Sequence, residues 1–148
     1  MDNTNLVPVI AYLLNQDTEI NNLVNGQIIA GLRAEPADPY LTGVNETCIG
    51  VSEVSEISTG TPGCRIHGRI DFIADFQIDV ISKRSAAFAL QISKLCRDMF
   101  VGDLESVFGG ENFQLRVMSV SRNSWYDPGT NQYHDTVTLK GKGIYWKK

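Results

Sequence analysis

The chain has 148 residues, 43% of them hydrophobic and 20% charged, which is typical of a folded domain and argues against disorder. Its formal net charge is -4, the wrong sign for a protein that binds phosphate backbones over its whole surface. A chain of this length buries about two-thirds of its unfolded surface around one core. The sequence therefore predicts a single domain over residues 1–148.

The cysteines are Cys48, Cys64 and Cys96, an odd number without the spacing of a metal site. We expect free thiols in a reducing compartment, and neither a metal nor another cofactor. The apolar run at 6–14 follows Asp2 rather than a basic segment and is too short to cross a bilayer. The sequence thus predicts no signal peptide and no membrane span.

Two short helices are predicted near the N-terminus. Residues 5–15 and 17–24 each carry apolar side chains at helical spacing. Asp17 or Thr18 is suited to cap the second helix. Asn25–Gly26 then ends it, because glycine tolerates the left-handed conformation found after a helix.

The next part of the chain predicts strands with irregular patterns. Residues 27–32 are apolar and suit a first strand, and after a proline-rich turn residues 40–42 return to extended chain. Residues 46–58 alternate only loosely and suit a weakly sided strand, and the stretch that follows is rich in glycine, threonine and proline, which is typical of a turn or a loop. We expect residues 46–63 to form a polar loop or a hairpin.

The longest regular pattern runs from residue 64 to 81. Apolar and polar side chains alternate throughout, which predicts one extended strand with an apolar and a polar face. Strands are usually five or six residues long, so this one is expected to protrude beyond a compact domain. The apolar set is Ile66, Ile70, Phe72, Ala74, Phe76, Ile78 and Val80.

A helix is predicted directly after this strand, at 84–101, with Ser82 or Ser85 as its cap. Its apolar stripe is Phe88, Ala89, Ile92, Leu95, Cys96 and Met99. Residues 113–122 and 133–146 predict two further strands, and a turn over 125–131 joins them as an antiparallel hairpin. The expected fold class is α+β, an antiparallel β-sheet with one main helix packed on a face.

Few residues suggest chemistry. Asp71, Asp75 and Asp79 share the polar face of the long strand at intervals of roughly 13 Å, too far apart for a carboxylate pair or a two-metal site. His67 and His134 have no nucleophile motif nearby, and we interpret both as structural or solvent-facing. The sequence predicts no catalytic residue.

Trp125 and Tyr126 lie side by side next to the predicted turn. Aromatic residues in that position either cover one end of a core or contact a partner surface. We keep both interpretations and name Trp125 and Tyr126 as a candidate partner contact.

The element order also carries a family resemblance. The segments concerned are Val9–Asp17, Leu23–Ile28, Pro39–Tyr40, Val80–Lys83 with the helix after it, and Phe113–Arg122 with Tyr133–Tyr145 around Asp127–Gly129. In this order they resemble the tail-terminator family of long-tailed bacteriophages, also called tail completion or head–tail joining proteins. The resemblance covers nearly the whole chain except residues 46–63, and it rests on element order and residue patterns, not on a catalytic signature.

This resemblance implies a structural virion protein without enzymatic activity. Similar proteins form homohexameric rings that cap the finished tail tube and present a surface to the head connector. The implied partners are further copies of the chain, the tail tube protein, the head–tail connector or adaptor and, in contractile tails, the sheath. DNA would pass through without specific binding, and the ring would assemble in the host cytoplasm and reside in the tail or neck of the virion.

Within such a ring, Asp71, Asp75 and Asp79 are the first candidates to line the lumen or an interface, where acidic side chains would keep DNA moving. Two other classes stay open. One is a different neck or tail component, such as a head–tail adaptor, a sheath-end ring or a tube subunit. The other is a small hydrolase that uses His67 or His134 with an aspartate.

Overall fold

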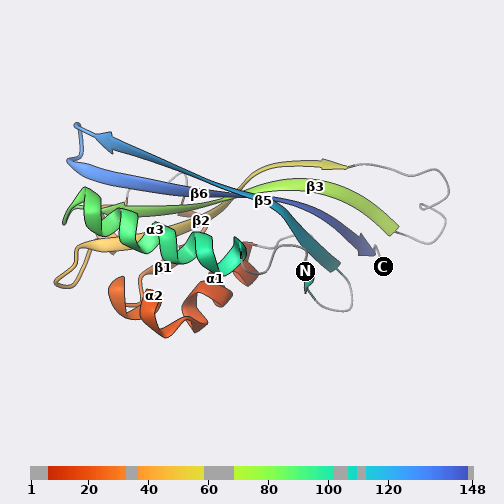
Figure 1. Ribbon diagram of the computed structural model, residues 1–148, viewed down its shortest axis with the longest axis horizontal. Helices are drawn as coiled ribbons and strands as arrows, with labels where there is room; N and C mark the ends of the chain where they lie inside the picture. The colour runs from red at the N-terminus through yellow and green to blue at the C-terminus, as the bar shows by residue number, and fades with distance from the viewer. Residues whose placement is uncertain (1–6, 33–36, 59–68, 102–106, 110–112, 147–148) are drawn as a thin grey trace.

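The computed structural model describes residues 7–32, 37–58, 69–101, 107–109 and 113–146. It is an α+β fold in which helices cover one face of a six-stranded sheet (Figure 1). The strands are β1 (Ile28–Ala30), β2 (Thr47–Ser58), β3 (Arg69–Ser82), β4 (Val107–Gly109), β5 (Phe113–Asp127) and β6 (Gln132–Trp146). The helices are α1 (Val7–Gln16), α2 (Thr18–Leu23), α3 (Ala86–Val101) and the 3-10 turn η2 (Asp38–Tyr40). None of the described helices has the length and apolar character needed to span a membrane.

The strand order in the sheet is β1-β2-β3-β6-β5-β4. The four long strands β2, β3, β6 and β5 pair antiparallel, as the sequence predicts. The short β1 differs, because it runs parallel to β2 and pairs only with Ile49–Val51. The sheet is therefore mixed at that end, and β4 at the other end was not predicted.

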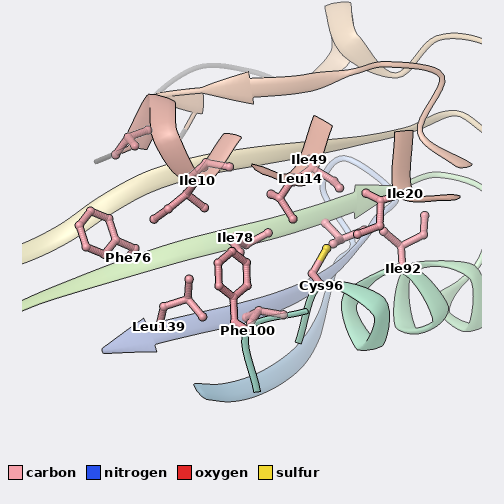
Figure 2. Close-up of a cluster of buried hydrophobic side chains, with 14 of the residues drawn as sticks. Ile10, Leu14, Ile20, Ile49, Phe76, Ile78, Ile92, Cys96, Phe100 and Leu139 are labelled. Atoms are coloured by element: carbon pink, nitrogen blue, oxygen red, sulfur yellow. The ribbon is translucent and has the colours of Figure 1, made fainter. Parts of the chain in front are cut away.

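Alternate side chains of β3 build the core. Phe72, Phe76 and Ile78 are buried on the face that α1 and α3 cover, while the intervening residues point to the other face. Figure 2 shows this cluster between the helices and the strands, with Ile92, Cys96 and Phe100 entering from α3. The predicted period of two in β3 is confirmed over the described residues, and residues 64–68 lie outside them.

Local capping explains where the helices begin and end. The Asp17 carboxylate accepts a hydrogen bond from the backbone N–H of Ile20 at 3.0 Å, and Ser85 Oγ accepts one from Phe88 N–H at 3.0 Å. Ser85 rather than Ser82 thus caps α3. After α2, Asn25 and Gly26 both adopt positive φ, the conformation that ends the helix there.

One expectation about the chain between β1 and β3 is wrong, and another is confirmed over the described residues. Residues 40–42 do not form a strand, because Pro39 lies in the first turn of η2, where its fixed φ suits a helical turn. Residues 47–58 form β2, the weakly sided strand predicted there, and β2 pairs with β3 as a hairpin. The alternation in β2 is loose because the register shifts between Glu53 and Ser55. Odd-numbered residues face the helices before Val54, and even-numbered residues do so after it. Residues 59–63 lie outside the described residues.

A matching irregularity interrupts β5, where the register shifts between Val117 and Ser119. Both bulges lie on one line across the sheet, since Ser55 pairs with Asp75, Asp75 with Lys140, and Lys140 with Ser119. Bulges bend a strand and increase its twist. Figure 1 shows the long strands crossing one another and continuing past the end of the helix layer. We call the part of the sheet beyond this line the arm.

The predicted turn at 125–131 is shorter than expected. Trp125, Tyr126 and Asp127 belong to β5, and only residues 128–131 connect it to β6, since Asp127 pairs with Gln132. The Asp127 carboxylate accepts the Gly129 N–H at 3.0 Å, which stabilises the turn. The β5–β6 hairpin itself is confirmed.

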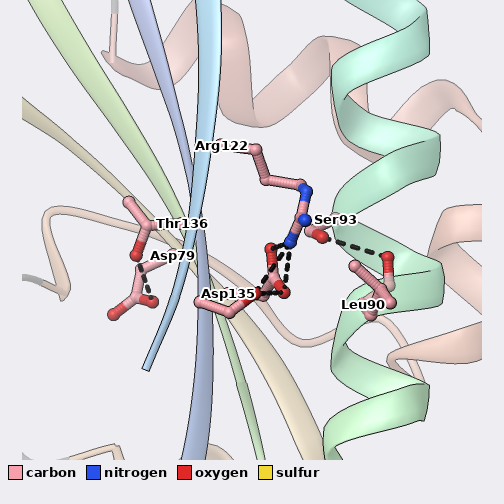
Figure 3. Close-up of polar contacts among 7 residues, drawn as sticks. Asp79, Leu90, Ser93, Arg122, Asp135 and Thr136 are labelled. Atoms are coloured by element: carbon pink, nitrogen blue, oxygen red, sulfur yellow. Dashed lines mark hydrogen bonds and ion pairs between the residues drawn. The ribbon is translucent and has the colours of Figure 1, made fainter. Parts of the chain in front are cut away.

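A buried ion pair lies between the sheet and α3. Arg122 Nη1 is 2.7 Å from both carboxylate oxygens of Asp135, and Ser124 Oγ donates a further hydrogen bond at 2.6 Å. The Asp135 side chain is 3% exposed and that of Arg122 26%. Figure 3 shows this pair on the α3 side of the strands. The pair satisfies a carboxylate that would otherwise be buried without a counter-charge.

We predict that Arg122→Leu lowers the free energy of unfolding by about 3–5 kcal/mol, because it leaves the buried Asp135 charge without its partner. Arg97→Leu is the matched control. Arg97 pairs with Asp98 at 2.9 Å, but their side chains are 37% and 63% exposed, so the cost should stay below about 1 kcal/mol. Urea denaturation at neutral pH measures both values. Equal losses in the two variants would contradict the prediction.

Candidate functional site

Three residues singled out in the sequence lie together on the face of the sheet opposite the helices: Asp79, Trp125 and His134. His134 Nδ1 lies 3.0 Å from an oxygen of the Asp79 carboxylate, and Thr136 Oγ1 donates to the other oxygen at 3.2 Å. Trp125 stacks on the His134 ring with a centroid distance of 3.8 Å and an interplanar angle of 13°. The register causes this contact, because His134 stands directly opposite both Trp125 and Ile81. Figure 3 shows Asp79 and Thr136 on the far side of the strands from Asp135.

These side chains form one wall of an open hollow of about 300 Å³. The opposite wall is the chain that follows β1, in which Leu32 and Ala37 pack with Cys48 and Ile81 as a second small apolar cluster. Gly50 makes this packing possible, since a Cβ at that position would lie 2.9 Å from Leu32 Cβ. The lining is completed by Asp38, Ser52, Gln77, Asp127, Thr130 and Gln132.

The carboxylates of the hollow all have partners. Asp38 lies 3.3 Å from Lys83 Nζ and accepts a hydrogen bond from Gln132 Nε2 at 3.1 Å. Hydrogen bonds from the Thr130 side chain and from the Gly129 and Thr130 backbone lower the pKa of Asp127. Burial, together with the nearby Asp79 charge, raises the pKa of the Cys48 thiol to about 12. Among the described residues, no group of three or more His, Cys, Asp or Glu side chains has the arrangement of a metal site.

The three aspartates predicted as an acidic stripe share one face, but they do not stand free. Asp71 is buried, Asp79 is bonded to His134 and Thr136, and Asp75 accepts a hydrogen bond from Ser55 Oγ at 3.0 Å. The neighbouring strand β6 places Lys140 directly opposite Asp75 and Lys142 two residues further on. The face therefore carries both signs of charge.

Trp125 and Tyr126 are both exposed, as the candidate partner contact requires. They point to opposite faces of β5, because they are consecutive residues of a strand. Trp125 covers His134, and Tyr126 lies against Tyr133 with ring centroids 4.9 Å apart. Each aromatic residue thus contacts another ring of the hairpin and is also partly exposed to solvent.

The Asp79–His134 pair has the orientation of a catalytic dyad, but the described residues place no nucleophile in hydrogen-bonding contact with His134. Within the described part of the chain, no serine, threonine or cysteine side chain forms a hydrogen bond with His134. The ring is buried and stacks against Trp125. His67 and Cys64 lie outside the described residues.

The structure adds exposed apolar residues at both bulges, which the sequence pattern did not indicate. Val54 and Ile57 on β2 are 39% and 64% exposed, and Met118 on β5 is 54% exposed. β1 covers β2 only at Ile49–Val51, and β4 covers β5 only at Gln114–Arg116. Both outer long strands therefore present edges that no other described strand pairs.

We predict that Cys48 and Cys96 resist alkylation in the folded protein. Burial raises the pKa of both thiols to about 12, so at pH 8 about one thiol in ten thousand is ionised, against about one in ten at a pKa of 9.0. Iodoacetamide treatment followed by peptide mass spectrometry measures labelling at each site, and the same reaction in concentrated urea is the control. Labelling at equal rates with and without urea would contradict the burial of these thiols.

Among the solved structures that share this fold is a chain from the virion of a native gene transfer agent (GTA) particle. It matches with a TM-score of 0.57 and 12% sequence identity, over 90% of this chain and 91% of that chain. No family model and no curated protein matches the sequence. At this level of identity the similarity establishes a common fold and no more.

Proposed function

We propose that this chain is a structural virion protein that forms a ring at the end of a phage-type tail tube and joins it to the head connector. The observation that carries the proposal is the fold, which this chain shares over nine-tenths of its length with a chain of a gene transfer agent virion. The order of elements that resembles the tail-terminator family supports the same assignment. In this proposal the chain has no enzymatic activity, and its lumen lets the genome pass.

The geometry of the sheet fits a closed ring. A ring built from identical subunits needs two different contact surfaces, one on each flank of the subunit. The outer long strands β2 and β5 lie on opposite flanks, and each has an edge that no other described strand pairs. A sheet with two such edges is stable against open-ended aggregation only when other chains or side-chain devices cover them.

The proposed lumen is the polar face of the sheet, where Asp71, Asp75 and Asp79 lie on β3. Because Lys140 and Lys142 stand on the neighbouring strand, this face alternates in charge. A surface of mixed sign holds a polyanion weakly, which suits DNA that passes through without specific binding. The proposed partners are further copies of the chain, the tail tube protein, the head–tail connector and, in a contractile tail, the sheath.

Negative-stain imaging and native mass spectrometry of the purified chain test the proposal. We expect closed rings of one fixed size, with a hexamer as the first candidate. A second candidate, a tube subunit, would instead stack into long cylinders, because its rings must bind one another. A chain that stays monomeric at every concentration and inside assembled particles would refute the ring.

The Asp79–His134 pair is the one observation that favours the hydrolase alternative. We predict that His134→Gln, which keeps a hydrogen-bonding side chain beside Asp79, leaves ring formation and particle function unchanged. Imaging of the variant protein and a particle complementation assay measure the two properties, with the wild-type chain as reference. Normal particles that have lost function would point to catalysis at His134 and count against a purely structural role.

A further inference from the structure

The hollow beside His134 contains polar side chains that have no partner. Ser52 on β2 and Gln77 on β3 stand directly opposite each other, and both line the hollow. Ser52 is 8% exposed, and neither side chain forms a hydrogen bond within the described part of the chain. Every fully enclosed side-chain oxygen or nitrogen of the described residues does have a partner, so the Ser52 hydroxyl must open into the hollow. A ligand that bonds this hydroxyl therefore recovers a hydrogen bond that folding leaves unmade.

Asp79 stands beside these two side chains. It lies two residues from Gln77 on β3, so both point to the same face of the sheet. Its carboxylate accepts hydrogen bonds from His134 and Thr136, and a carboxylate has about four acceptor positions, so it can accept more. Ser52, Gln77 and Asp79 thus form a floor of the hollow that is rich in acceptors.

The hollow favours a positively charged ligand. Two further carboxylates, Asp38 and Asp127, line it, and no lysine or arginine is among its described lining residues. Lys83 lies 3.3 Å from Asp38, but Asp127 has no ion-pair partner within the described chain and accepts hydrogen bonds only from its own turn. The charge around the hollow is therefore negative, which repels phosphate and carboxylate groups and attracts cations.

The shape of the hollow and its apolar wall select arginine among the cations. The volume of about 300 Å³ is at the lower end of the range for small-molecule sites, and the hollow is open, so one long side chain can enter it. Leu32, Ala37 and Ile81 offer an apolar wall to the carbon stem of such a side chain, and the partly exposed Trp125 ring suits stacking with a guanidinium. A guanidinium has five N–H donors in a fixed plane, which match several separate acceptors better than an ammonium does.

We propose that the hollow binds the side chain of an arginine that a partner protein presents. The guanidinium donates to Asp79 and Ser52 on the floor, the carbon stem packs against Leu32 and Ile81, and the backbone of the partner stays outside. Charge complementarity assigns this occupant, since the hollow supplies the acceptors and the negative charge that a guanidinium requires. The inference rests on the proposed function for one point only, that the partner is another protein of the virion.

Three small probes test the site on the purified chain. The first is a blocked glycine–arginine–glycine peptide. The second is the same peptide with citrulline, which keeps the shape of arginine without its charge, and the third is methylguanidinium, which lacks the carbon stem. The chain has two tryptophans, so Trp146→Phe leaves the indole N–H signal of Trp125 as the reporter in NMR titrations at constant ionic strength.

We expect the arginine peptide to bind at least about tenfold more tightly than either other probe, because it alone combines charged hydrogen bonds with a buried stem. Equal binding of the citrulline peptide would overturn the role of charge. Equal binding of methylguanidinium would reveal a site for small cations only and would overturn the side chain as occupant.

Ser52→Ala and Asp79→Asn separate binding from folding. The Ser52 hydroxyl bonds no described residue, so Ser52→Ala should keep the melting temperature within about 2 °C of the wild type while it weakens binding of the arginine peptide about fivefold. Asp79→Asn should weaken binding about tenfold. Asp98→Asn, which neutralises an exposed carboxylate on α3, is the control and should bind as the wild type does. Unchanged binding in both Ser52→Ala and Asp79→Asn would overturn the site.

The same titrations distinguish other sources of the arginine. Arg33 lies between Leu32 and Ala37 in the sequence, outside the described residues. If Arg33→Gln strengthens binding of the arginine peptide by about tenfold, the chain's own Arg33 fills the hollow, which would overturn a partner's arginine. Disassembly of wild-type rings by the peptide would place the arginine on a second copy and overturn it too. A ring that binds no arginine peptide would overturn the site and leave the proposed ring in place, whereas a monomer that binds it would support the site and count against the ring.

Discussion

The alternation of apolar and polar side chains along β3 is the constraint on which the rest of the structure depends. One set of its side chains, including Phe76 and Ile78, is sealed under α1 and α3, and the other set forms the polar face with Asp79 and Gln77. Because side chains alternate with a period of two, this strand fixes the inward face of β2 and β6 through direct pairing. The ion pair of Arg122 with Asp135 under α3 and the contact of His134 with Asp79 on the far side follow from that assignment.

The sequence predicted most elements because their signals are local. The caps of α2 and α3, the stripe of α3 and the alternation of β3 each depend on a few neighbouring residues. The missed features depend on the fold as a whole. The parallel pairing of β1 and the strand β4 could not be read from propensity, and the bulge at Val54 hides which residues of β2 face the core. Pro39 was read as the end of a turn, yet it lies within η2.

In the candidate site, too, the predictable features depend on local sequence and the missed ones on contacts between distant residues. Exposure of Trp125 and Tyr126 was one of two interpretations of their position near a turn, and the shared face of Asp71, Asp75 and Asp79 follows from spacing alone. Their partners are non-local. His134 reaches Asp79 across 55 positions of sequence, and Lys140 stands opposite Asp75 only through the β3–β6 register. The acidic stripe therefore becomes a face of mixed charge once the neighbouring strand is in place, which no pattern within β3 could indicate.

The bulge at Val54 changes how this strand would respond to a deletion. A one-residue deletion inside a regular strand turns every later side chain to the other face. In β2 the extra residue is already outside the pairing, since Glu53 stands opposite Phe76 and Ser55 opposite Asp75. Removing Val54 would leave Ser55 and Ile57 on their present face and would straighten the strand. Length variation among relatives would thus be tolerated at this position, and it would alter the curvature of the arm rather than which side of the sheet is buried.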